Sequence, residues 1–282
     1  MVSSQLSLAA GMTAGAIEGF ITYPTEFIKT QLQLGTSPTP LECIKTTVRT
    51  RGIAGLYKGM SALLVGNSLK AGVRFMGFET YKQFLARWFD NTTALVGAGL
   101  LAGITEAVLV VTPSETVKTK LIHDQNIANP RFRGLVHAVR LIVKEEGAGG
   151  IYRGMNAVIA RQGANSAVRM SSYSILRGKA SQYYLGNFLP LYVTFGIGSV
   201  AGIITVYATQ PLDVIKTKMQ SIGAAARYKG MIDCATKTIT DNGVRALWKG
   251  STPRLGRLIV SGGIVFSVYE KVIEIAKQFD YQ

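Results

Sequence analysis

The octet PTEFIKTQ at residues 24–31 directly follows the apolar stretch LSLAAGMTAGAIEGFITY at 6–23. Proline removes a backbone donor and clashes with the preceding turn, so it is a poor choice inside a helix. The chain nevertheless repeats the octet as PSETVKTK at 113–120 and PLDVIKTK at 211–218. Every copy places an acid and a lysine three residues apart after its proline, which indicates a repeated structural unit.

A second motif follows each octet, as GIAGLYKG at 52–59, GAGGIYRG at 147–154 and GVRALWKG at 243–250. The first glycines of these motifs are 95 and 96 residues apart, and Cys43 and Cys234 each stand nine residues before theirs. Two motifs that recur in the same order predict a triplicated chain. We place the three repeats at residues 1–90, 91–185 and 186–282 and expect them to form a single domain.

The composition is typical of a membrane protein, because 48% of the 282 residues are hydrophobic, 17% are charged and the mean hydropathy is +0.23. The net charge of +15 indicates an anionic partner, which could be nucleic acid, a membrane surface or a substrate. Two cysteines exclude a disulfide framework and a CxxC metal site. The first residues, MVSSQL, do not resemble a signal peptide.

Each repeat opens and closes with an apolar segment, and a polar, amphipathic stretch lies between the two. The opening segments, at 6–23, 94–112 and 188–210, are nearly free of charge and long enough to cross a bilayer. The closing segments are at 60–78, 155–173 and 255–269. We therefore predict an all-α membrane protein with six transmembrane helices in three tandem pseudo-symmetric repeats, each with a short amphipathic helix. A soluble helical protein is the alternative, but soluble cores seldom contain three such runs.

Six cations lie in or directly before the closing segments, namely Lys70, Arg74, Arg161, Arg169, Arg254 and Arg257. Each would cost roughly 3 kcal/mol if it faced lipid, so they must face water, protein or a ligand. Their spacing puts the cations of each helix on one face. The closing helices therefore present basic stripes to a shared interior, which would attract a multiply charged anion.

The neighbours of these cations narrow the class of anion. Asn67, Gln162 and Asn165 could bond a hydroxyl or carbonyl, and guanidinium groups pair bidentately with carboxylates. Few aromatic side chains accompany the cations, which disfavours a nucleotide, and phosphate would scarcely need six bases. A di- or tricarboxylate fits best.

Two acids, Glu18 and Glu106, occupy equivalent places in the first two opening segments. We expect each to pair with an interior arginine, and the alternative is a role in proton coupling. One more residue separates Glu106 from its proline than separates Glu18 from Pro24, so a local helix irregularity is expected before Pro113.

The octet charges have two interpretations. Spacing of i,i+3 permits pairs within one helix, but threefold pseudosymmetry also lets an acid of one repeat reach a lysine of the next. The two motifs together, over nearly the whole chain, resemble the mitochondrial carrier family. That resemblance implies the second arrangement, a matrix-side ring with the pairs Glu26–Lys118, Glu115–Lys216 and Asp213–Lys29, formed where prolines kink the odd-numbered transmembrane helices. It also implies that the amphipathic helices lie on the matrix side and that Gln31 braces one pair.

A cytoplasmic gate is implied by the same resemblance, at FETYK (78–82), YSILR (173–177) and YEKVI (269–273). Only the first stretch is complete, because Ser174 and Ile273 cannot pair. The remaining charges are Glu79, Lys82, Arg177 and Glu270. They allow at most the bridges Glu79–Arg177 and Glu270–Lys82, so we expect a weaker barrier on that side.

Within the family, the stretch at 251–272 is most similar to carriers of tricarboxylates, and the stretches at 21–27 and 205–217 support this similarity. This implies obligatory exchange of citrate for malate or another di- or tricarboxylate across the mitochondrial inner membrane, by alternating access. The expected substrate-binding residues are Asn67, Lys70, Arg74, Arg161, Gln162, Asn165, Arg169, Arg254 and Arg257. We expect a transporter rather than an enzyme, with no cofactor or metal, that works as a monomer among membrane lipids such as cardiolipin.

Other functions stay open at this point. The same fold could carry an oxodicarboxylate, phosphate or a nucleotide, or it could form a channel or leak. Nucleic-acid binding is disfavoured because many of the bases lie inside apolar segments. His123 and His137 are expected to be surface residues rather than ligands.

Overall fold

The computed structural model describes residues 4–127, 129–183 and 189–261, and all regular secondary structure in these residues is helical. The first repeat contains α1 (Ser4–Leu34), α2 (Pro40–Arg51), the 3-10 turn η1 (Ile53–Tyr57) and α3 (Met60–Leu85). The second contains α4 (Asn91–Glu106), η2 (Ala107–Val111), α5 (Thr112–Asp124), α6 (Leu135–Glu146), η3 (Ala148–Gly150) and α7 (Met155–Tyr183). The third contains α8 (Leu191–Met219), α9 (Ala224–Arg227), α10 (Met231–Asn242) and η4 (Val244–Trp248). A further helical stretch, 251–261, begins the last predicted apolar segment, whose remainder lies outside the described residues.

The octets continue their helices instead of ending them. Pro24 lies inside α1 and Pro211 inside α8, so the charges that follow are still helical. In the second repeat Pro113 lies in the first turn of α5, directly after a π-helical turn at Ala107–Val111. A π turn accommodates one extra residue. The irregularity expected from the count of residues between Glu106 and Pro113 is therefore confirmed.

The second motif forms the same turn in all three repeats. An amphipathic helix ends at a glycine of positive φ, a short 3-10 turn follows, and a second glycine of positive φ starts the next helix. These second glycines are Gly59, Gly154 and Gly250, with φ of 87°, 79° and 84°. L-residues with side chains rarely adopt such angles, which explains why the motif ends in glycine.

The two cysteines are buried free thiols at equivalent places, Cys43 in α2 and Cys234 in α10. Burial raises the pKa of both thiols above the usual value of 9.0. Their equivalence agrees with their interpretation as positions of a repeated unit.

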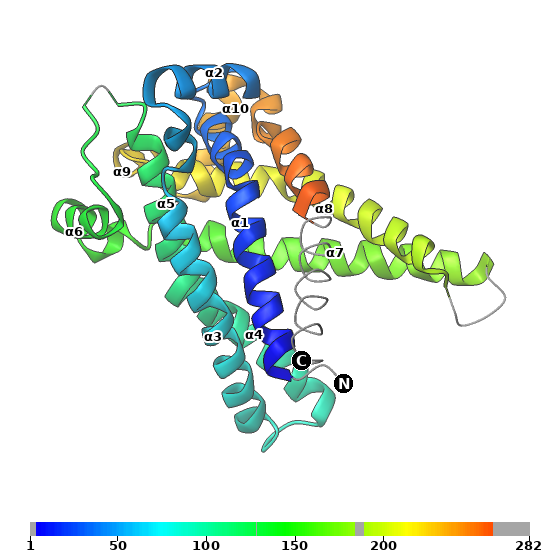
Figure 1. Ribbon diagram of the computed structural model, residues 1–282. Coiled ribbons are helices and arrows are strands. Elements are labelled where there is room, and N and C mark those ends of the chain that lie inside the picture. The colour runs from blue at the N-terminus through cyan, green and yellow to red at the C-terminus, as the bar shows by residue number, and fades with distance from the viewer. Residues whose placement is uncertain (1–3, 128, 184–188, 262–282) are drawn as a thin grey trace, which may run out of the picture.

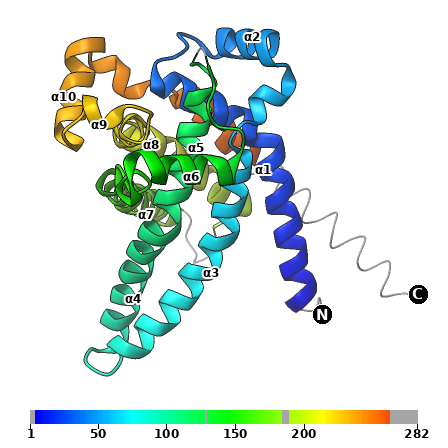
Figure 2. The same cartoon turned by 90° about the vertical axis from the view of Figure 1, so that its left-hand side faces the viewer.

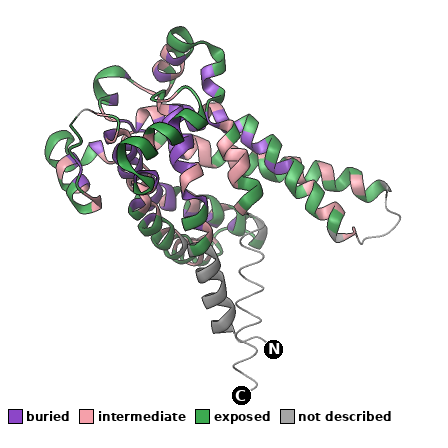
Figure 3. Ribbon diagram, turned by 45° about the horizontal axis from the view of Figure 1, so that its top comes forward, coloured by how far each residue is buried: buried purple, intermediate pink, exposed green. Residues whose placement is uncertain are grey.

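The helices converge at one end of the molecule and diverge from it. In Figure 1 α2 and α10 both lie near the top, the α3/α4 hairpin runs downward and the α7/α8 hairpin extends to the right. Figure 2 shows α7 and α8 nearly end-on while α3 and α4 lie in the plane, so the two hairpins point in different directions. Buried residues gather where the later halves of α1, α5 and α8 meet, and the ends of the hairpins are exposed (Figure 3).

The exposed surface is that of a protein surrounded by lipid. The helical runs Thr93–Asp124 and Tyr192–Met219 are long and apolar enough to cross a membrane. Helices α1, α3 and α7 have 31, 26 and 29 residues, which is also sufficient length, but they carry more polar residues. Large apolar side chains such as Phe20, Leu69, Leu100 and Phe195 are exposed on α1, α3, α4 and α8. Apolar exposure on this scale indicates contact with a membrane rather than water.

Candidate functional site

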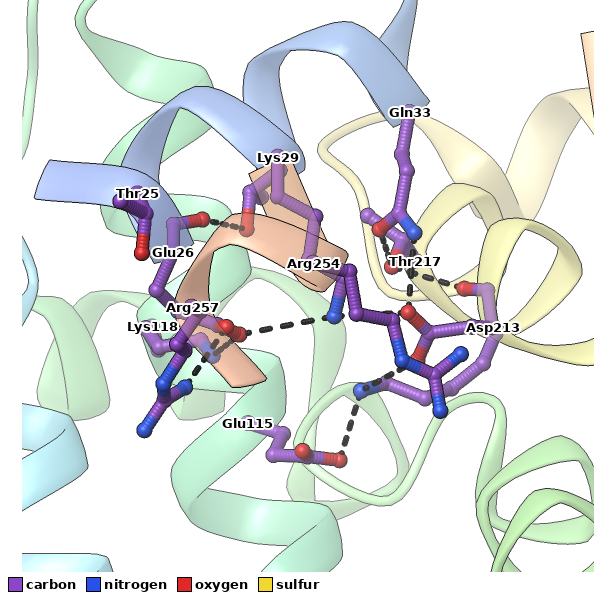
Figure 4. Close-up of polar contacts among 12 residues, drawn as sticks. Thr25, Glu26, Lys29, Gln33, Glu115, Lys118, Asp213, Thr217, Arg254 and Arg257 are labelled. Carbon is purple, nitrogen blue, oxygen red and sulfur yellow. Dashed lines mark hydrogen bonds and ion pairs between the residues drawn. The ribbon is translucent and has the colours of Figure 1, made fainter. Parts of the chain in front are cut away.

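The six octet charges form a closed ring where α1, α5 and α8 meet (Figure 4). The three pairs predicted between repeats are all present: Lys118 Nζ lies 2.8 Å from Glu26 Oε1, Lys216 Nζ 2.8 Å from Glu115 Oε2, and Lys29 Nζ 2.6 Å from Asp213 Oδ2. The side chains in these pairs are at most 19% exposed.

Pairs within one helix are longer. Lys29 and Glu26 are 3.7 Å apart, and Lys216 and Asp213 are 3.9 Å apart. The shorter contacts therefore join different repeats, as the resemblance implied. Each repeat is tied to both others, so the helices cannot separate at this level without breaking ion pairs.

The amide that contacts the ring is Gln33, which the motif did not single out. Gln33 is 1% exposed, donates through Nε2 to Asp213 Oδ2 at 2.9 Å and accepts from Thr217 Oγ1 at 2.7 Å. Gln31, the predicted brace, instead donates to the main-chain carbonyl of Ile122 at 3.2 Å. The prediction for Gln31 is corrected in this respect: it links α1 to α5 through the backbone and makes no hydrogen bond to a ring charge among the described residues.

Two arginines of the even-numbered transmembrane helices reach the ring acids from the cavity side. Arg257 Nη1 lies 2.8 Å from Glu26 Oε2, and Arg161 lies 3.5 Å from Glu115 and 3.4 Å from Asp213. Both arginines belong to the predicted substrate-binding set. In this conformation their positive charge is shared with the ring.

A hollow of about 310 Å³ lies directly against the ring. It is lined by residues of the ring and by six of the predicted substrate-binding residues. These six are Arg161, Arg169, Arg254, Arg257, Asn67 and Asn165. Gln162 and Lys70 line a smaller adjoining hollow of about 70 Å³, which they share with Arg161 and Asn67. The structure thus brings eight of the nine predicted substrate-binding residues to two neighbouring hollows.

Arg254 is held by neutral oxygens. It donates to Gln210 Oε1 at 3.1 Å, to Thr209 Oγ1 at 3.0 Å and to Asn165 Oδ1 at 3.3 Å. Sequence reasoning missed Gln210 and Thr209. A sequence signal existed for Gln210, because it directly precedes its octet proline, as Tyr23 does. In the structure both side chains donate to the main-chain carbonyl of the basic residue in the second motif, Gln210 to Lys249 and Tyr23 to Lys58.

The ninth predicted residue, Arg74, lies on α3 one turn after Lys70. Both cations contact Glu106, which is fully buried: Lys70 Nζ and Arg74 Nη1 each lie 3.5 Å from one of its oxygens. Glu18 lies 3.7 Å from Arg257. The expectation that both acids pair with interior cations is confirmed.

The predicted cytoplasmic charges are not joined in this conformation. Within the described residues no ion pair links Glu79, Lys82 and Arg177, so the expected Glu79–Arg177 bridge is absent here, and Glu270 lies outside the described residues. The reason is geometric, because the α3/α4 and α7/α8 hairpins diverge on the side away from the ring (Figure 1). In the described part of the chain, the helices are joined at the ring and diverge toward the opposite end.

The histidines lie away from the hollows. His137 is exposed, as expected, whereas His123 is half-buried and its Nδ1 accepts a hydrogen bond from the amide of Ile222 at 3.1 Å. The expectation of a surface position is therefore wrong for His123, which fastens α5 to the segment after α8. The described part of the chain contains no group of three or more potential metal ligands.

Comparison with known proteins agrees with this architecture. The model of the family described as "Mitochondrial carrier protein" matches residues 2–88, 90–183 and 187–279. An uncharacterized mitochondrial carrier of Schizosaccharomyces pombe is 50% identical over 97% of this chain and 94% of that protein. Mitochondrial tricarboxylate transporter 1 of Mycosarcoma maydis is 44% identical over 96% and 95% of the two chains, and mitochondrial citrate transporter A of Aspergillus niger is 45% identical over 99% and 94%. The chain therefore belongs to the mitochondrial carrier family and is a transporter rather than an enzyme.

Proposed function

We propose that this carrier exchanges a tricarboxylate such as citrate for malate or another di- or tricarboxylate across the mitochondrial inner membrane, by alternating access. The observation that carries the proposal is the hollow lined by four arginines directly against the ring. Guanidinium groups match carboxylates in charge and geometry. The names of the two characterised relatives, which concern tricarboxylate and citrate, support the same class of substrate.

The ring is proposed as the matrix gate and the hollow as the substrate site of the cytoplasm-open state. Lys70, Arg74 and Gln162 would complete the site beside the four arginines. Glu79, Lys82 and Arg177 would form the cytoplasmic gate in the opposite state, after the two hairpins approach each other. The proposed carrier works as a monomer, surrounded by membrane lipid such as cardiolipin.

Two contacts suggest how substrate opens the ring. Arg257 and Arg161 contact ring acids in this conformation. A bound carboxylate would compete for the same guanidinium groups and leave Glu26, Glu115 and Asp213 with fewer cationic partners. A ligand shifts a conformational equilibrium only by its difference in affinity between states, and this competition supplies such a difference.

Obligatory exchange has an electrostatic explanation in the same site. An empty hollow holds several like charges that repel one another, and a bound polyanion neutralises them. The return of an empty carrier through the occluded state would bury this uncompensated charge, which is costly. Loaded carriers avoid that cost in both directions.

The test is transport by the purified protein in liposomes. We expect rapid uptake of labelled citrate into vesicles that contain citrate or malate, and none into empty vesicles. Arg257→Ala and Arg161→Ala should each reduce exchange at least about tenfold, because a charged hydrogen bond is worth about 1.5 to 3 kcal/mol. Arg227→Ala is the matched control, since Arg227 pairs with Asp241 on the surface and should leave exchange unchanged.

Two results would contradict the proposal in different ways. Exchange of ADP, phosphate or an oxodicarboxylate without exchange of citrate would retain the ring and refute the tricarboxylate assignment. Uptake into empty vesicles as fast as exchange would refute antiport and indicate a channel or leak.

A further inference from the structure

Glu106 is a buried acid that contacts two of the predicted interior cations. It is the last residue of α4, its side chain is 0% exposed, and its two oxygens lie 3.5 Å from Lys70 Nζ and 3.5 Å from Arg74 Nη1. The side chains of Lys70 and Arg74 are 41% and 65% exposed. The acid is thus buried, while the two cations that it contacts reach the solvent.

The π turn η2 begins directly after Glu106. Glu18, the equivalent acid, stands in the uninterrupted helix α1 and lies 3.7 Å from Arg257 of the third repeat. Arg257 is held more closely by Glu26, at 2.8 Å. Glu106 comes directly before η2, which contains the additional residue of this repeat. It contacts Lys70 and Arg74 of α3, whereas Glu18 contacts Arg257. Such π turns occur often at functional sites.

No other acid within the described residues comes within ion-pair distance of Lys70 or Arg74, so Glu106 alone offsets their charge there. Lys70 also lines the smaller hollow with Asn67, Arg161 and Gln162. The contact therefore acts on a cation that faces the substrate site.

The charges of the interior can be balanced from the sequence. The three ring acids and three ring lysines cancel, and the six cavity cations against Glu18 and Glu106 leave four net positive charges. A bound trianion would leave one of these uncompensated and a dianion two. Each of the two acids lowers the net positive charge of the interior by one, and it therefore changes the anion charge that neutralises the interior best.

We infer that Glu106 is a positioning residue that sets the preferred valence of the transported anion, by holding Lys70 and Arg74 in place and offsetting one of their charges. This inference rests on the proposed exchange of carboxylates. The attraction between the cavity and a bound anion scales with the product of their charges. Removal of the Glu106 charge should favour a trianion more than a dianion.

The experiment compares the KM values for external citrate and external malate in vesicles loaded with malate, at a pH where citrate is a trianion. In Glu106→Gln the ratio of the malate KM to the citrate KM should rise about threefold over the original protein. Glu106→Asp keeps the charge and should return the ratio to its original value even where Vmax is lower. Glu145→Gln removes an acid that pairs with Arg131 outside the cavity, and it should leave the ratio unchanged.

Lys70→Gln provides a second test that does not depend on the folding of Glu106→Gln. Loss of this cation should lower the same ratio, because the interior then holds one positive charge fewer. A lower Vmax in Glu106→Gln with an unchanged KM ratio, or an unchanged ratio in Lys70→Gln, would overturn the inference. Failure of the original protein to exchange citrate for malate would instead refute the proposed function.

Discussion

Asp213 is bound at one oxygen by two groups of the first repeat, Lys29 at 2.6 Å and Gln33 at 2.9 Å. The lysine neutralises the carboxylate, and the amide fixes its orientation, because a hydrogen bond weakens steeply when it is bent. Thr217 fixes the amide by donating to Gln33 Oε1. At the ring, the first and third repeats are thus joined by an ion pair and by a hydrogen bond from an amide whose orientation is fixed.

Replacement of Gln33 by methionine should make the ring easier to open. The variant keeps the volume but removes a hydrogen bond to a charged group, worth about 1.5 kcal/mol or more, which corresponds to about a tenfold shift of an equilibrium. We expect efflux of labelled citrate into anion-free buffer to rise up to about tenfold. Unchanged efflux would mean that the amide does not contribute to closure.

Gln31→Met is the matched comparison for that measurement. Gln31 is equally buried, but it donates to the carbonyl of Ile122 rather than to a ring acid. Its loss should lower thermal stability without a comparable rise in efflux.

The ring pairs could be predicted from sequence, whereas this amide could not. Pairing between repeats follows from three equivalent octets and threefold symmetry. Nine residues after their prolines the repeats carry Gln33, Ile122 and Gln220, which do not share one chemistry. Contacts that obey the repeat are predictable from one chain, and contacts made by a single repeat require coordinates.

At the scale of elements, the glycine that follows each 3-10 turn allows close approach between repeats. A Cβ on Gly250 would lie 3.1 Å from the carbonyl oxygen of Lys29 and 3.2 Å from Gln33 Cγ. The equivalent contacts of Gly59 and Gly154 reach the carbonyls of Lys118 and Lys216, at 3.3 and 3.7 Å. Each turn is therefore seated against the helix that carries the next ring lysine.

Gly250→Ala should destabilise the protein on two grounds. An L-residue at this positive φ costs about 1 to 2 kcal/mol, and the new methyl group presses on a main-chain carbonyl that cannot rotate away. We expect the midpoint of thermal unfolding to fall by about 4 °C or more, measured in detergent. The control is Gly230→Ala, where φ is −175° and nothing lies within 4 Å, so little or no decrease is expected. Equal midpoints in the two variants would contradict this account of the turn.

The helices extend beyond the apolar segments from which they were predicted. The apolar segments end near the octet prolines, and α1 and α8 run on to Leu34 and Met219, which agrees with the expectation that the octet charges lie on the same helices. The apolar pattern of the sequence locates the part of a helix that faces lipid. The polar remainder of the helix is stabilised by contacts with other repeats, and these contacts cannot be read from the sequence of one repeat. The π turn was predictable because counting residues between two equivalent positions needs no knowledge of packing.

At the scale of the whole molecule, the basic residues of the second motif contribute unequally to the three interfaces between repeats. Lys58 Nζ donates to the carbonyl of Phe132 at 3.0 Å, which joins the first repeat to the second. Arg153 Nη2 donates to the carbonyls of Tyr228 and Ala224, at 3.1 and 3.2 Å, which joins the second to the third. Lys249, the equivalent residue of the third repeat, is exposed and makes no such side-chain bond in the part of the chain that the structure describes.

This inequality predicts different effects for three equivalent substitutions. Lys58→Met removes one hydrogen bond from a charged donor to a carbonyl and Arg153→Met removes two, each variant at a cost of about 1.5 kcal/mol or more. Each should lower the midpoint of thermal unfolding by about 3 to 6 °C. Lys249→Met should leave it unchanged and serves as the internal control. A decrease of the same size in all three variants would show that these three residues contribute equally to stability.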